Sequence, residues 1–134
     1  MRNQFRLTPD GKVRLVENDV EEQCIQIAHY RGYWESRNHI GKFWTWDRKR
    51  VITGHTTGTP DWTFVHAIYP GFLLETKRPG AKPTPEQEKQ IAILSEWGPR
   101  LAVCVADNKD YFAEWLDKHE RMAIERMITM SRAP

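Results

Sequence analysis

The chain has 134 residues, a length that suits one domain with a single hydrophobic core. Its net charge of +2 is too small to indicate a nucleic-acid binder by bulk electrostatics. No apolar run is long enough to span a bilayer and the N-terminus lacks the apolar block of a signal peptide, so we expect a cytoplasmic protein with no membrane partner. Cys24 and Cys104 lack CxxC spacing, which indicates buried free thiols rather than a zinc knuckle or disulfide scaffold.

The first half of the chain is expected to hold a short hairpin or loosely ordered arm, a helix and two extended stretches. A turn signal at 8–11 separates two short apolar runs, so residues 1–15 form the arm or hairpin. Apolar residues at three- and four-residue steps predict a helix over 16–31, which Gly32 ends. Extended structure is expected over 33–40 and 43–53.

Strands dominate the middle of the chain. Residues 61–68 and 71–77 are expected to form two strands joined by a tight turn at 69–71. The uninterrupted apolar run at 101–106 suits a buried strand. A last helix then carries three large apolar side chains inward: Phe112, Trp115 and Leu116.

The helix expected over 85–97 has a well-specified start. Thr84 is a candidate N-cap, Pro85 occupies the first helical position, and Gln87 completes a capping-box pattern. Gly98 is expected to end this helix.

The order of elements predicts an α/β fold with a central mixed β-sheet flanked by helices. Without repeats or a low-complexity linker, residues 1–134 are expected to form one domain, with 118–134 as a C-terminal helical extension. The apolar residues of that extension suit a homodimer interface or the capping of the domain's own core.

Two carboxylates and a lysine are the candidates for chemistry. Glu75 and Lys77 lie two residues apart on a strand, so they project from the same face. Asp61, held extended by Pro60, begins the preceding strand and can approach that face if the two strands pair. Carboxylate oxygens suit Mg²⁺ or Mn²⁺, which can activate water for phosphodiester hydrolysis. A Glu-x-Lys pair is more often a solvated surface pair, but here it lies on an otherwise apolar strand, where charges need partners or a metal.

The sequence Pro60-Asp61 followed by Glu75-Thr76-Lys77 resembles the motif of the PD-(D/E)xK nuclease superfamily. The finer pattern, over roughly residues 16–115, is similar to the VRR-NUC branch of small replication and repair nucleases. Its further features are an early glutamate-bearing helix ending near Gly32, then Arg37-Asn38, Gly41, Gly58-Thr59, Pro85-Glu86-Gln87 and an apolar strand after Gly98.

The resemblance implies a restriction-endonuclease-like core and a metal-dependent DNA endonuclease that uses Mg²⁺ or Mn²⁺. Whether cleavage is structure-specific stays open at this point. Asp61 and Glu75 would ligate the metal together with the backbone carbonyl of Thr76. Lys77 would be the catalytic lysine. Gln87 would lie at the edge of the site, although a capping-box glutamine needs no catalytic purpose. Small stand-alone nucleases of this type resemble phage products and suggest a homodimer.

The helix carboxylate of the family has two candidates. Counting back from Gly32, the family spacing favours Glu17, while Glu21 lies one turn later on the same face. The alternative is a solvated acidic first turn that is favourable to the helix dipole.

A basic stretch supplies the candidates for nucleic-acid contact, with a solvated charged face as the alternative. Trp34, Trp44 and Trp46 alternate with these residues and could stack on unpaired bases. Trp44 and Trp46 also share one strand face, which favours a place in the core for them. The candidates for phosphate contact are Arg37, Asn38, Lys42, Arg48, Lys49 and Arg50.

Two other classes of function remain open. The first is a nucleic-acid-binding module on the same scaffold without cleavage; retention of both carboxylates and the lysine argues against it. The second is a hydrolase of small phosphate compounds, which ranks last because the basic stretch over 31–50 exceeds what a small substrate requires.

Overall fold

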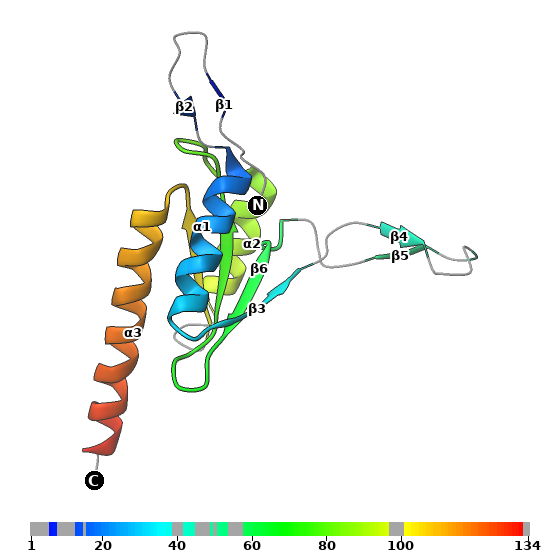
Figure 1. The fold of residues 1–134 in the computed structure, drawn as a ribbon. Coiled ribbons are helices and arrows are strands. Elements are labelled where there is room, and N and C mark those ends of the chain that lie inside the picture. The colour runs from blue at the N-terminus through cyan, green and yellow to red at the C-terminus, as the bar shows by residue number, and fades with distance from the viewer. Residues whose placement is uncertain are drawn as a thin grey trace.

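A four-stranded mixed sheet forms the centre of the structure, a computed structural model (Figure 1). The sheet has the order β3-β6-β7-β8, in which β3, β6 and β7 are antiparallel neighbours and β8 runs parallel to β7. The strands are β3 (Trp34–Arg37), β6 (Trp62–Val65), β7 (Phe72–Thr76) and β8 (Ala102–Ala106). The structure describes residues 6–7, 13–14, 16–38, 42–44, 49, 51–53, 58–96 and 101–132.

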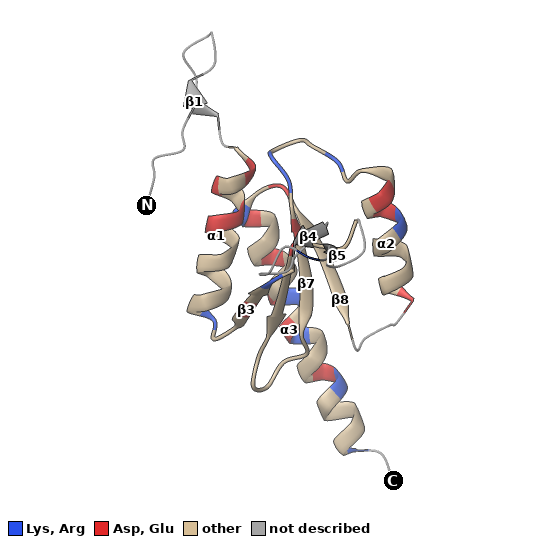
Figure 2. Cartoon of the chain, turned by 90° about the vertical axis from the view of Figure 1, so that its right-hand side faces the viewer, with Lys and Arg blue, Asp and Glu red and all other residues tan. Residues whose placement is uncertain are grey.

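Helices lie on both sides of this sheet, which confirms the predicted α/β class. The helices are α1 (Glu17–Tyr30), α2 (Pro85–Ser95) and α3 (Lys109–Ser131). The side chains of α1 and α3 share one hydrophobic core with β6, β7 and β8. Figure 2 shows the sheet between α1 and α2, and α2 packs against β8. The strand predicted to be buried, β8, is therefore an edge strand of the four-stranded sheet, covered by helices.

Phe72 lies at the centre of the core. Its ring stacks on Phe64 with centroids 4.8 Å apart and meets Tyr33 and Trp115 edge-on at 5.2 and 5.1 Å. Phe112 and Leu116 of α3 are fully buried, so the predicted inward face of the last helix is confirmed. Cys24 and Cys104 are buried free thiols, also as predicted, and burial raises the pKa of Cys24 to about 12.

Local sequence signals set the helix ends. The carboxylate of Asp19 accepts the N–H of Val16 at 3.0 Å and so caps the start of α1. Gly32 has φ +88° directly after α1, a conformation that only glycine adopts at little cost, which explains why the helix stops there. At α2, Gln87 N donates to Thr84 Oγ1 at 3.3 Å and Thr84 N to Gln87 Oε1 at 2.9 Å, which confirms the predicted capping box.

Two connections differ from the sequence-based expectation. The stretch expected to be extended over 43–53 forms two strands, β4 (Lys42–Trp44) and β5 (Val51–Thr53), which pair antiparallel with each other. A period-two pattern of apolar residues predicts extended structure but does not show that the chain reverses its direction within the stretch. The connection from β6 to β7 spans 66–71 and is wider than the tight turn predicted, because Nδ1 of His66 accepts the N–H groups of Ile68 and Tyr69.

The N-terminal and C-terminal segments are partly described. The short strands β1 (Arg6–Leu7) and β2 (Val13–Arg14) pair antiparallel. This pairing agrees with the hairpin predicted for residues 1–15 rather than with the loosely ordered arm. In the C-terminal extension Ala123 is buried, whereas Met127 and Ile128 are each 45% exposed; a homodimer stays a prediction.

Three residues named in the sequence-based predictions, Trp46, Trp97 and Gly98, lie outside the described residues. Within the described part of the chain, no helix combines the length and the apolar character needed to cross a membrane.

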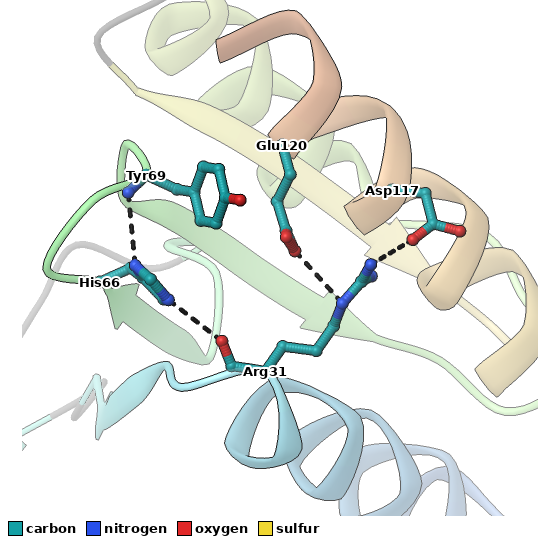
Figure 3. Close-up of polar contacts among 5 residues, drawn as sticks. All are labelled: Arg31, His66, Tyr69, Asp117 and Glu120. Atoms are coloured by element: carbon teal, nitrogen blue, oxygen red, sulfur yellow. Dashed lines mark hydrogen bonds and ion pairs between the residues drawn. The ribbon is translucent and has the colours of Figure 1, made fainter. Parts of the chain in front are cut away.

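An ion-pair network fixes the C-terminal end of α1 to α3 (Figure 3). Arg31 Nε lies 3.2 Å from Oε1 of the buried Glu120, and its guanidinium also pairs with Asp117. The main-chain carbonyl of Arg31 accepts from Nε2 of His66 at 3.0 Å, which connects the same residue to the β6–β7 loop. Arg31 thus joins three elements at the end of α1 that lies opposite Glu17.

We expect Arg31→Met to lower the free energy of unfolding by about 1.5–3 kcal/mol, because the carboxylate of Glu120 would lose its charged partner. Arg31→Met combined with Glu120→Gln should recover most of that loss, since no buried charge then lacks a partner. Urea unfolding of both variants measures this. Equal losses in the single and double variants would show that the ion pair does not hold the two helices together.

Candidate functional site

Acidic residues from three elements meet at one end of the sheet. Glu17 is the first residue of α1, Asp61 directly precedes β6, and Glu75 lies near the end of β7. One carboxylate oxygen from each of the three lies within 4.8 Å of the others. Lys77 follows β7, and its Nζ is 3.4 Å from Oε1 of Glu75. The structure therefore brings together the two carboxylates and the lysine that the sequence singled out.

The carboxylate of Glu75 is buried but surrounded by donors. Its side chain is 2% exposed. Oε1 accepts from Nε2 of Gln87 at 2.7 Å and faces Lys77, while Oε2 accepts from the main-chain N–H of Asp61 at 3.2 Å. These contacts fix the direction in which the carboxylate points.

Gln87 belongs to the capping box and also contacts Glu75, so it lies at the edge of the candidate site. Its Oε1 accepts the N–H of Thr84 in the capping box, while Nε2 of the same amide donates to Glu75. The cap therefore fixes the orientation of the amide, and the amide in turn restrains Glu75.

A close contact between main chains brings α2 to the site. Gly58 has φ +90°, and a Cβ placed on it would lie 2.4 Å from the carbonyl oxygen of Glu86. Only glycine allows the loop before Asp61 to touch the first turn of α2 this closely. Gly58 belongs to the family-like motif, but its contact with Glu86 could not be predicted from the sequence, because no local pattern connects the two residues.

Burial and neighbouring negative charges raise the pKa of two carboxylates of the site. Burial, and then the nearby charge of Asp61, raise the pKa of Glu75 from 4.5 to about 7. Burial also raises the pKa of Asp61, to which the charges of Glu21 and Glu17 add. The four carboxylates are opposed by Arg37 and Lys77, the two cations that lower the pKa of Asp61.

The geometry distinguishes the two candidate helix carboxylates. Glu17 belongs to the group with Asp61 and Glu75. Glu21 instead has its Oε1 3.7 Å from the guanidinium of Arg37, which also lies over the ring of Trp62 at 5.4 Å. Glu17 is therefore better placed for a ligand role, as the sequence spacing favoured.

The oxygen donors of the site fit Mg²⁺ or Mn²⁺. Ligands about 2.1 Å from an octahedral ion are about 3.0 Å apart when adjacent and about 4.2 Å apart when opposite. The three carboxylate oxygens lie within 4.8 Å of one another, so at most a small side-chain movement separates them from this geometry. Thr76, whose carbonyl is the further predicted ligand, is fully buried between Glu75 and Lys77.

The predicted nucleic-acid contacts are only partly described. Arg37 lies beside the acidic cluster with 58% of its side chain exposed. Asn38 is half-buried and points inward, where its amide contacts the carbonyl of Pro60 and the hydroxyl of Thr63. Lys49 is exposed, and Lys42 is described only as part of β4. Arg48 and Arg50 lie outside the described residues.

No family model matches the chain, and a search of curated proteins finds no significant match.

The raised pKa of Glu75 predicts how stability depends on pH. Between its ordinary value of 4.5 and the folded value of about 7, the folded chain keeps a proton that the unfolded chain releases. The free energy of unfolding contributed by this group is thus fully present below pH 4.5 and is lost as pH rises through about 7. Glu75→Gln removes this pH-dependent loss. In EDTA, the free energy of unfolding of the variant should therefore increase relative to that of the parent by about 1–3 kcal/mol when the pH is raised from about 4 to about 8.

Urea unfolding of both proteins in EDTA at the two pH values measures the gain. A difference between parent and variant that is the same at both pH values would contradict a buried carboxylate with a raised pKa. Exposed Glu114, changed to Gln, serves as the matched control and should show no such pH-dependent gain.

Proposed function

We propose that this protein is a divalent-metal-dependent DNA endonuclease of the VRR-NUC type, built on a restriction-endonuclease-like α/β core. The observation that carries the proposal is the meeting of Glu17, Asp61 and Glu75 within 4.8 Å, with the ammonium of Lys77 3.4 Å from Glu75. The order of these residues along the chain is that of the family motif. Their convergence supports the resemblance, since it is not a consequence of the motif's spacing.

The carboxylates would hold the cation, with Asp61 and Glu75 as the main ligands. Mg²⁺ or Mn²⁺ bound there would polarise a phosphodiester and lower the pKa of a coordinated water. Gln87 keeps Glu75 in one orientation through its hydrogen bond of 2.7 Å, so the ligand is preorganised. The carbonyl of Thr76, between the two motif residues, is the further ligand that the resemblance implies.

Lys77 would stabilise the negative charge that develops on the phosphate. Its side chain is only 12% exposed, and in such surroundings the charge of an ammonium acts more strongly than in water. A lysine needed only as a partner for Glu75 would leave unexplained why Asp61 lies in the same small volume.

Cationic residues around the acidic centre support a long polyanionic substrate. Arg37 is exposed beside the cluster, and Arg78 and Lys82 are exposed in the loop that follows Lys77. Basic side chains of this kind contact the phosphates flanking the one that is cleaved. Binding of a small phosphate ester would not require these additional cationic residues.

The function is tested by incubating labelled single-stranded, duplex, flap and four-way-junction DNA with Mg²⁺, Mn²⁺ or EDTA. We expect metal-dependent cleavage that falls by about 100-fold or more in Asp61→Asn and Lys77→Ala. The exposed Lys118→Ala and Glu114→Gln, both on α3, serve as matched controls and should keep most of the activity.

Unchanged cleavage by Asp61→Asn or Lys77→Ala would contradict the assigned site. DNA binding in EDTA without cleavage in any metal would contradict the nuclease proposal and favour a binding module on the same scaffold.

A further inference from the structure

Asn38 makes three hydrogen bonds to the chain around Asp61. Its main-chain N–H donates to the carbonyl of Asp61 at 2.7 Å, and its side-chain Nδ2 donates to the carbonyl of Pro60 at 2.8 Å. Its Oδ1 accepts from the hydroxyl of Thr63 at 2.9 Å. Asn38 directly follows β3, so the edge strand of the sheet supplies these contacts.

These bonds hold the two peptide groups that flank the Cα of Asp61. In the peptide before it, the carbonyl of Pro60 is held by Asn38 and the N–H of Asp61 by Glu75. In the peptide after it, the carbonyl of Asp61 is held by the N–H of Asn38. Two fixed peptide planes determine φ and ψ at the residue between them, and therefore the direction of its Cα–Cβ bond.

The main-chain bond from Asn38 to Asp61 continues the register of β3 and β6, but the sheet does not provide the restraint on Pro60. β6 begins at Trp62, so Pro60 and Asp61 precede the strand, and Pro60 has no N–H to donate. Pro60 is fully buried, and a buried carbonyl requires a donor. The side chain of Asn38 supplies that donor.

Thr63 fixes the amide of Asn38 in turn. Its hydroxyl donates to Oδ1, which leaves Nδ2 facing Pro60 and prevents the amide from turning over. On the other side of the same loop, Gly58 lies in close contact with the main-chain carbonyl of Glu86. The loop before Asp61 is therefore restrained from both β3 and α2.

We propose that Asn38 is a positioning residue, which sets the carboxylate of Asp61 toward Glu75 so that the two bind one divalent cation. This inference rests on the proposed metal site, and it replaces the phosphate contact that the sequence suggested for Asn38. An amide engaged at both ends in holding the loop does not need nucleic acid as a partner.

Two affinities, measured separately, distinguish positioning from phosphate contact. Isothermal titration gives the Mn²⁺ affinity without DNA, and a mobility-shift assay in EDTA gives the DNA affinity without metal. We expect Asn38→Ala to weaken Mn²⁺ binding by about 10-fold or more while DNA affinity in EDTA stays at the parent value. Ser36→Ala, an exposed change on the same strand, should alter neither affinity.

Thr63 provides a gentler variant should Asn38→Ala not fold. Thr63→Val keeps the shape but removes the hydroxyl donor, and it should weaken Mn²⁺ binding by a smaller factor. Thr63→Ser keeps the hydroxyl and should bind Mn²⁺ like the parent. A purely steric role would reverse this order, because serine removes a methyl group that valine retains.

Three outcomes would overturn the inference. The first is unchanged Mn²⁺ affinity in both Asn38→Ala and Thr63→Val, and the second is loss of DNA affinity in EDTA by Asn38→Ala at unchanged Mn²⁺ affinity. The third is that the parent protein does not bind Mn²⁺. Mn²⁺ binding by a parent that cuts no DNA would overturn the nuclease proposal, while the positioning role would still be decided by the variants.

Discussion

Burial of the Glu75 carboxylate beside Asp61 is the constraint on which the candidate site depends. Removing a carboxylate from water is costly, and a second negative charge nearby adds to that cost, so the pKa of Glu75 rises to about 7. Hydrogen bonds from Gln87 and from the main chain of Asp61 offset part of the cost. In the metal site that we propose, a divalent cation would offset the rest, and the folded chain would then be more stable with metal than without it.

Each element around the site contributes to this arrangement. β7 carries Glu75 into the interior, and α2 brings Gln87 to it because Gly58 permits close contact between main chains. The first turn of α1 adds Glu17. The network of Arg31 fixes the other end of α1 to α3, so the helix that bears Glu17 is secured far from the site (Figure 3).

Local signals predicted much of this structure. The capping box at Thr84, the helix stop at Gly32 and the shared face of Glu75 and Lys77 depend on residues close together in sequence, and the structure contains all three. The contacts that join distant segments were not predictable in this way. The hydrogen bond from Asn38 to Pro60 joins residues 22 positions apart, and neither periodicity nor composition predicts such a contact.

The most direct test of the central claim is the anomalous diffraction of crystals grown with Mn²⁺. One strong peak is expected within about 2.3 Å of carboxylate oxygens of both Asp61 and Glu75, with Lys77 and Gln87 beside it. The peak should disappear in Asp61→Asn. Crystals in saturating Mn²⁺ with no peak between these two carboxylates would contradict the claim that their burial creates a metal site.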